Sequence, residues 1–395
     1  MTLISDNAAL TAFCDRLSAE RYITVDTEFM REKTYWPQLC LLQLGGTDEA
    51  AAVDVLAEGI DLAPVQALMA APDILKVFHA ARQDIEILYI LSGTVPAPLF
   101  DTQIAAMVCG FGDSVGYDTL VAKLTKGHVD KSSRFTDWSR RPLSAHQLAY
   151  AISDVVHLRA VYEKLARRLE HSGRTHWLEA EMATLTNPAT YRTEPSEAWR
   201  RIKLRGARPR MLAVLREIAA WREREAQERN IPRNRVLRDE ALLDIAAQAP
   251  TTMAELARTR GLGRGLAESR RGAALLAAVA AGTALPDDAC PHLPRKPDIP
   301  SGLRPVIDLL KVLLKMKCEA HDVAQKLVAS SAALELIAAD DNAQVPALSG
   351  WRREIFGEDA LALKHGRLAL TVDGKKLRLF RPPEADAAAP VQAEL

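Results

Sequence analysis

ITVDTEF, at residues 23–29, is the stretch around which the N-terminal half of the chain is organised. Its apolar, β-branched residues predict a buried strand that ends in two acids, Asp26 and Glu28. Residues two apart on a strand point to the same face, so the two carboxylates project together. Adjacent carboxylates repel each other and resist burial, and a divalent cation would relieve both costs. The alternative is a polar strand end with two solvated acids, which is common for an isolated pair of this kind.

The composition is that of an ordinary globular protein with room for two to four domains. The chain has 395 residues, of which 48% are hydrophobic and 26% charged. Its five cysteines contain no C-x-x-C pair, which argues against a disulfide framework or a zinc site and suits a reducing compartment. The N-terminus shows no secretion signal, and the longest apolar stretch, at 273–281, is too short to span a bilayer. We therefore expect a cytoplasmic protein without membrane contact.

The net charge of zero conceals an asymmetry between two parts of the chain. Residues 1–130 contain 18 Asp and Glu against 8 Lys and Arg, whereas residues 191–280 contain 11 against 19. An acidic body followed by a basic segment favours a metal-binding domain beside a module that binds a polyanion. Chance patterning of solvated faces is the alternative.

The hydrophobic pattern of residues 1–170 alternates between strands and helices, which predicts an α/β domain with a mixed sheet. Strands are expected in a meander at 23–29, 39–44 and 51–55, and a further strand at 74–78, just before His79. Helices are expected at 7–20, 65–70, 80–91 and 143–169. Residues 100–102 open another helix, of which Asp101 is the expected N-cap.

The rest of the chain is predicted to be helical, apart from a short hairpin near its end. Proline-rich and polar stretches at 186–198 and 282–300 are expected to be linkers. An arginine-rich helical block lies between them, and helices are expected again at 303–339 and 352–356. The dipeptide Asp373-Gly374 between two apolar segments, 368–372 and 376–380, predicts a β-hairpin. Residues 383–395 are expected to be disordered.

Three further side chains can join the first acid pair. Asp84 follows the predicted strand at 74–78, and Tyr150 and Asp154 lie four apart on a predicted helix, hence on one face. A phenol and a carboxylate on one face could be no more than a satisfied hydrogen bond. Four acids in one site are different, because packing rarely gathers uncompensated carboxylates whereas hard divalent metals require oxygen ligands.

Three motifs carry a family resemblance: VDTEF, HAARQD and YAISD, which begin at residues 25, 79 and 150. Their order and spacing resemble the DEDD superfamily of 3′–5′ exonucleases, in the branch with tyrosine in the third motif. The stretches YWPQLCLLQL, FDTQIAA and KSSRFTDWSRRPLS narrow the resemblance to the ribonuclease D family. The arginine-rich block at 207–285 resembles the HRDC domain (helicase and RNase D C-terminal domain), and residues 300–360 resemble a second, more divergent copy.

The resemblance implies an architecture of four parts. A ribonuclease H-like exonuclease domain, with a mixed sheet flanked by helices, would occupy residues 1–198. Two all-α domains would follow, an HRDC domain at 199–285 and an HRDC-like domain at 300–360. A β-hairpin and a disordered tail would fill residues 361–395.

The resemblance also implies two divalent metal ions, Mg²⁺ or Mn²⁺, as cofactors. Asp26 would bridge both ions, Glu28 and Asp154 would complete the site of the catalytic water, and Asp84 would serve the second ion. Tyr150 would orient the attacking water, since a phenol with an ordinary pKa near 10 is a poor base.

Other residues in or near these motifs, and in the arginine-rich block, are candidates for contact with RNA. Phe29 could stack on the terminal base or be a core aromatic, and His79 could touch the terminal nucleotide or only cap its helix. The arginines could hold phosphates or belong to solvated faces. The full set of expected substrate contacts is Thr27, Phe29, His79, Gln83, Arg134, Arg141, Arg233 and Arg235.

The sequence therefore predicts a cytoplasmic, monomeric, metal-dependent 3′–5′ exoribonuclease that releases nucleoside 5′-monophosphates. By resemblance its substrates are RNA 3′ ends, in particular tRNA precursors, and no protein partner is identifiable. One alternative is a DNA exonuclease of the same branch, because contacts to the 2′-OH are not visible in a sequence. The other alternative is a non-catalytic RNA-binding scaffold, against which the intact set of acids argues.

Overall fold

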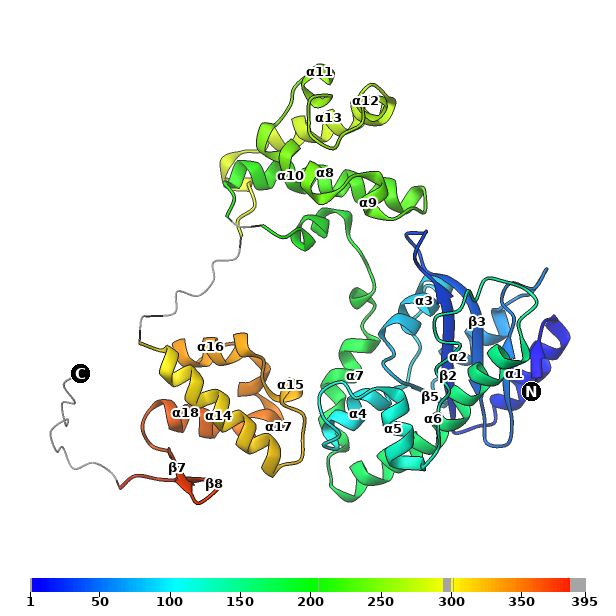
Figure 1. Cartoon of the computed structure of the whole chain (residues 1–395), viewed down its shortest axis with the longest axis vertical. Coiled ribbons are helices and arrows are strands. Elements are labelled where there is room, and N and C mark those ends of the chain that lie inside the picture. The colour runs from blue at the N-terminus through cyan, green and yellow to red at the C-terminus, as the bar shows by residue number, and fades with distance from the viewer. Residues whose placement is uncertain (1, 205, 294–299, 301, 384–395) are drawn as a thin grey trace.

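The computed structural model describes residues 2–204, 206–293, 300 and 302–383, and it has three parts (Figure 1). An α/β domain, coloured blue to cyan-green, contains the N-terminal residues. Two helical units follow along the chain, the second of which carries a small hairpin. The expected disordered tail at 383–395 lies, except for its first residue, outside the described residues. No helix of the described part has the length and apolar character that crossing a bilayer requires.

The predicted mixed sheet is confirmed, and the strand with the two acids lies near its centre. The sheet has the order β1-β4-β3-β2-β5-β6. β2 pairs antiparallel with β3 and parallel with β5, and β3 pairs antiparallel with β4, so the predicted meander is also confirmed. The strands are β1 (Thr2–Ile4), β2 (Tyr22–Met30), β3 (Gln38–Gly45), β4 (Ala50–Val53), β5 (Leu75–Phe78) and β6 (Leu99–Asp101).

The sequence pattern does not predict β1 and β6, because three residues each are too few to show a periodicity. Residues 100–102 are expected to open a helix, whereas β6 runs through Asp101 and helix α4 (Thr102–Val108) begins one residue later. The predicted cap is confirmed, since the Asp101 carboxylate accepts from the backbone N–H groups of Gln103 and Ile104.

Helix α6 (Ala145–His171) is the element that closes the site against the sheet. It begins two residues later than predicted because Ser144 is its N-cap, in a capping box with Gln147. The other helices of this domain are α1 (Asn7–Leu17), α2 (Ala63–Ala70), α3 (Arg82–Ser92), α5 (Tyr117–Thr125), which the pattern does not predict, and α7 (Glu179–Thr186).

Close contact between α6 and the sheet depends on one small residue. The Thr24 hydroxyl of β2 donates to the Val155 carbonyl of α6 at 2.8 Å. A Cβ added to Gly45 of β3 would lie 2.5 Å from the Thr24 hydroxyl oxygen and 3.4 Å from Val155. The absence of a side chain at Gly45 therefore lets the helix lie directly on β2 and β3.

The two helical units repeat one arrangement. In the first, the long helix α8 (Pro209–Glu228) is followed by the one-turn helix α9 (Arg233–Val236) and by α10 (Asp239–Gln248). In the second, α14 (Arg304–Ala320), α15 (Gln325–Val328) and α16 (Ser331–Ala339) follow in the same order and with similar lengths. The remaining α-helices are α11 (Met253–Leu256), α12 (Arg264–Ala267) and α13 (Arg270–Thr283), and then α17 (Gly350–Arg352) and α18 (Glu358–Lys364), which a π-helical turn at Arg353–Gly357 connects.

Both units contact the α/β domain through the same corner, the turn between the long helix and the one-turn helix. Asn230 and Asp322 occupy equivalent places in this turn, and both have a positive φ, 47° and 49°. The Asn230 side-chain oxygen accepts from the backbone N–H groups of Tyr35 and Trp36, at 3.1 and 3.0 Å. Asp322 forms an ion pair with Arg168 of α6 at 2.7 Å. The two units therefore share both the order of their first three helices and the corner by which they contact the α/β domain.

A buried polar cluster strengthens the contact of the first unit. Glu223 of α8 is inaccessible to solvent, pairs with Arg233 at 2.5 Å and accepts a hydrogen bond from the Tyr35 hydroxyl. Burial favours protonation of this carboxyl, but the bonds from Arg233 and Tyr35 outweigh it and lower its pKa. Glu223 is therefore an ionised group whose partners come from both parts of the molecule.

A pair of stacked tryptophans joins the second unit to the α/β domain. Trp351 stacks on Trp177 with ring centroids 4.1 Å apart and an angle of 4° between the ring planes.

The predicted hairpin is confirmed as β7 (Ala369–Asp373) paired with β8 (Lys376–Phe380). Its two-residue turn is Gly374-Lys375, one residue later than predicted, because Gly374 adopts the positive φ of 61°.

Replacing Glu223 with alanine should loosen α8 locally. The change leaves Arg233 and Tyr35 without their buried partner, at a cost of roughly 2–4 kcal/mol. Amide hydrogen exchange along α8 should accelerate accordingly, while the exchange of β2 and β3 stays as in the wild type. Glu228→Ala, at an exposed position on the same helix, is the matched control and should change exchange little. Equal exchange in both variants would contradict the structural role of Glu223.

Candidate active site

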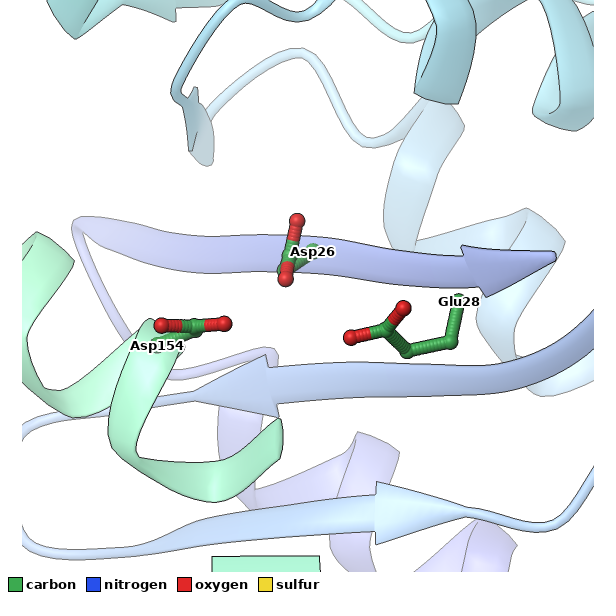
Figure 2. Close-up of side chains that lie close together, drawn as sticks. All are labelled: Asp26, Glu28 and Asp154. Atoms are coloured by element: carbon green, nitrogen blue, oxygen red, sulfur yellow. The ribbon is translucent and has the colours of Figure 1, made fainter. Parts of the chain in front are cut away.

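Three carboxylates from two elements meet at one place in the α/β domain. Asp26 and Glu28 project from β2, and Asp154 projects from α6. One oxygen of each lies within 4.8 Å of the others. Figure 2 shows the Asp154 and Glu28 side chains reaching toward each other from either side of Asp26. The structure thus brings together three of the four predicted acids.

The fourth acid, Asp84, lines the same cleft but is held separately. It lies in the first turn of α3, is buried, and accepts a hydrogen bond from the Thr27 hydroxyl. Thr27 alternates with Asp26 and Glu28 along β2, so its side chain leaves the other face of the strand. Asp84 therefore approaches the three-acid group from the side of α3.

The turn between β5 and α3 is positioned by Asp101. Its carboxylate accepts from the backbone N–H groups of Ala80 and Ala81 at 3.0 and 2.9 Å, and Ala80 adopts a positive φ of 56°. A non-glycine residue in this conformation costs free energy unless its surroundings hold it there. Asp101 thereby fixes the turn that presents His79, Gln83 and Asp84 to the cleft.

Burial and mutual repulsion make the acids hold protons. Burial, followed by the charges of Asp26 and Asp154, raises the pKa of Glu28 to about 10. Burial also raises the pKa of Asp154 to about 7, an increase that the Tyr150 hydroxyl and the Arg134 guanidinium partly offset. The pKa of Asp26 is raised by burial and then by Asp154. Without added positive charge, these three carboxylates cannot all be ionised at neutral pH.

Unpaired oxygen atoms show that the site fits a divalent cation. Within the described residues, Asp154 Oδ1 is buried and has no hydrogen-bond donor. Gln43, which stands directly opposite Asp26 in the β2–β3 register, is fully buried, and neither atom of its amide has a partner in the described part. Oxygen ligands of this kind are what Mg²⁺ and Mn²⁺ bind. The residues present are thus suited to hold metal ions.

Tyr150 lies one helical turn before Asp154 and lines the cleft. Burial raises its pKa, and the charges of Asp154 and Glu28 raise it further. The phenol therefore stays protonated at neutral pH and can donate a hydrogen bond. His79 is neutral as well, because burial lowers its pKa to about 4, and its Nδ1 lies 3.0 Å from the Thr102 hydroxyl.

A cleft of about 620 Å³ surrounds the acids. Five of the expected substrate contacts line it, namely Thr27, Phe29, His79, Gln83 and Arg134. The cleft is also lined by aromatic side chains that the sequence does not single out, which are Tyr117, Phe135 and Trp138.

Three expected substrate contacts lie elsewhere, and two of them have structural partners instead. Arg141 is bound by both carboxylate oxygens of Asp54, at 2.7 and 2.6 Å, and by the Cys40 carbonyl. Arg233 neutralises the buried Glu223. Arg235 lies exposed on α9, outside the cleft. The sequence shows that an arginine carries a positive charge. It does not show that an acid far away along the chain already neutralises that charge.

The sequence misses Gln43 and Tyr117 as parts of the site. The Tyr117 hydroxyl donates to the Asp154 backbone carbonyl, and its ring lies 5.2 Å from that of His79. Only Gln43 could have been noticed in the sequence, because it is a polar residue within the apolar run LCLLQL. No comparable local pattern marks Tyr117.

Comparison with known proteins places this site in a family. A 3′–5′ exonuclease family model matches residues 1–170, and an HRDC domain model matches residues 211–279. A ribonuclease D from Granulibacter bethesdensis is 56% identical, over 96% of each chain. The chain belongs to the ribonuclease D family. Another family member, from Gluconacetobacter diazotrophicus, is 54% identical over 95% of this chain and 96% of its own.

Solved structures agree with this assignment. The crystal structure of Escherichia coli RNase D, an exoribonuclease involved in structured RNA processing, matches with a TM-score of 0.78 and 34% identity. It covers 92% of this chain and 98% of its own. The catalytic core of RRP6 from Trypanosoma brucei matches with a TM-score of 0.53 and 25% identity, over 72% of this chain and 80% of its own. As a member of the ribonuclease D family, the chain is a 3′–5′ exoribonuclease.

Metal binding at this site should release protons and strengthen as pH rises. Because the pKa of Asp154 is raised to about 7, a cation that needs its ionised form competes with a proton below that pH. The apparent Kd for Mg²⁺ or Mn²⁺ should fall about tenfold per pH unit, for each proton released, between pH 6 and 7. Calorimetry in two buffers of different ionisation enthalpy counts these protons.

The Asp154→Asn variant should release about one proton fewer per bound ion, and Asp48→Asn, at an exposed turn, should behave as the wild type. A Kd that is constant from pH 6 to 8 would show that the acids are already ionised in the metal-free protein.

Proposed function

We propose that this exoribonuclease removes nucleotides one at a time as 5′-monophosphates, by a two-metal hydrolysis, and that tRNA precursors are among its substrates. The observation that carries the proposal is the group of three facing carboxylates in an open cleft, with Asp84 beside them. Such a group is costly to a folded protein unless a cation and an anionic substrate use it.

Each acid has a part in this proposal. Asp26, between the other two, would help to hold both ions, with Glu28 and Asp154 completing one site and Asp84 serving the other. When bound, the ions supply positive charge that acidifies a water molecule and stabilises the leaving 3′ oxygen. The Thr27 hydroxyl holds Asp84 by a hydrogen bond, and Gln43 stands directly opposite Asp26 in the β2–β3 register.

Tyr150 would orient the attacking water by hydrogen bonding. Its hydroxyl faces Asp154, and its raised pKa keeps the proton on the phenol. Arg134 would contact the phosphate backbone, since it lines the cleft. Phe29, His79 and Gln83 line the same cleft and would contact the terminal nucleotide.

We also propose that the protein works as a monomer in the cytoplasm. Its five cysteines are all buried and unpaired, which suits a reducing compartment.

The rival functions make distinct predictions. A DNA exonuclease of the same branch would cleave DNA as fast as RNA, and a scaffold would bind RNA without cleaving it.

Pure protein should shorten a 3′-extended tRNA from its 3′ end with Mg²⁺ or Mn²⁺, and EDTA should stop the reaction. A matched DNA strand should be cleaved much more slowly. Equal rates on both would favour the DNA exonuclease, and binding without cleavage under either metal would favour the scaffold.

Asp26→Asn should abolish cleavage and leave RNA binding within a few-fold of the wild type, because it removes a proposed metal ligand without removing the cleft. The measurement is turnover of a labelled oligoribonucleotide beside its Kd. Asp48→Asn is the control and should retain activity. Full activity of Asp26→Asn would disprove the proposed site.

Tyr150→Phe should lower kcat by about 10²-fold with little change in KM, because an orienting hydrogen bond acts mainly in the transition state. Steady-state kinetics on the same oligoribonucleotide checks it. An unchanged kcat would remove Tyr150 from the proposed machinery.

A further inference from the structure

Phe135 is the most exposed large apolar side chain of the described residues. It is 90% exposed, whereas the next, Val372, is 70% exposed. Leaving a whole aromatic ring in water forgoes the free energy that its burial would provide. An exposed aromatic ring at the rim of a cleft is therefore a candidate for contact with a ligand.

The ring stands at the mouth of the active-site cleft. Phe135 lines the cleft together with Asp26, Glu28 and Asp154. Its neighbour Arg134 lines the cleft as well, and the Arg134 guanidinium lies 5.3 Å from the centroid of the Phe135 ring. An aromatic ring and a cationic group thus lie side by side in the lining of the cleft that contains the acids.

The segment beneath the ring is tied to the domain on both sides. The buried Ser133 hydroxyl lies 2.8 Å from His146 Nδ1, and the Thr136 hydroxyl donates to the Ser133 carbonyl at 2.8 Å. The Gln147 side-chain amide donates to the Thr136 hydroxyl at 3.2 Å, and the Trp138 side chain is buried. The backbone on either side of Phe135 is therefore held, and the ring is presented outward from an anchored segment.

We propose that Phe135 is a stacking platform for a nucleobase of the RNA strand that enters the cleft, upstream of the terminal nucleotide, while Arg134 contacts the adjacent phosphate. The proposal rests on the proposed function of this cleft. A π face accepts any base, so the platform would add affinity without reading sequence. A contact of this kind suits an exonuclease that advances by one nucleotide per cycle, because each base in turn occupies the place of the one before.

A nucleobase fits these observations better than a protein partner. Protein interfaces form around clusters of apolar side chains, whereas the Phe135 ring stands beside the guanidinium of Arg134. A single ring next to a cationic group matches a stacked base with its phosphate.

The first test measures RNA binding without cleavage, in the Asp26→Asn background. Adding Phe135→Ala should raise the Kd for a short oligoribonucleotide about 5- to 100-fold. Phe135→Trp should retain or improve binding, and Leu91→Ala, which truncates an exposed apolar residue at the far end of α3, should leave it unchanged. Equal Kd values for the background protein and its Phe135→Ala derivative would overturn the proposal.

An abasic scan then locates the stacked base. A single abasic nucleotide is moved stepwise from the 3′ end of the oligoribonucleotide. At one position it should weaken binding to the Asp26→Asn protein that retains Phe135. At that same position it should not weaken binding to the Phe135→Ala derivative any further. An identical scan for both proteins would overturn the proposal, even if affinity differs. The slope of log K against log salt should fall by about 1 for Arg134→Ala and stay constant for Phe135→Ala.

In active protein, the loss in Phe135→Ala should appear mainly in KM. If the wild type does not cleave RNA, the proposed function is rejected. The binding measurements still test whether Phe135 stacks on a base. Normal binding and normal KM in Phe135→Ala, with an active wild type, would reject the platform alone.

Discussion

The hydrogen bond from the Thr24 hydroxyl to the Val155 carbonyl marks the contact on which the site depends. It joins β2 to α6 two residues before Asp26 and one residue after Asp154. The bare backbone at Gly45 leaves room for this approach. Apolar side chains of α6, at Ala151, Val155 and Leu158, are buried close to this contact. Their packing helps to hold together three carboxylates that repel one another. The fold opposes the repulsion, and a cation would remove it.

Most of the site could be predicted because its signals are local. Asp26 and Glu28 share a face by the period of a strand, and Tyr150 and Asp154 by the period of a helix. The pairings that decide the other residues are not local. Arg141 and Asp54 are 87 residues apart, and no pattern around either one reveals the other. The exposure of Phe135 is equally invisible, because in a sequence a phenylalanine most often indicates a core.

The basic character of residues 191–280 has a partly internal explanation. Arg222 is buried and pairs with Asp239, Arg233 pairs with Glu223, and Arg210 pairs with Asp287. These arginines hold the first helical unit together and attach it to the α/β domain, so fewer than the 19 counted basic side chains are open to contact with a polyanion. A count of charges indicates a distinct basic segment, but it does not show which of its arginines are paired with acids of the protein itself.

The repeated corner at Asn230 and Asp322 makes the molecule a doubly tethered assembly. Each helical unit touches the α/β domain at its own place, and the chain joins the units to each other. If one corner detaches, the contact at the other corner keeps the detached unit close to its contact site on the α/β domain. The unit is then at a high effective concentration there and rebinds as an intramolecular event. Few hydrogen bonds per corner are then sufficient for the arrangement of the three parts to persist.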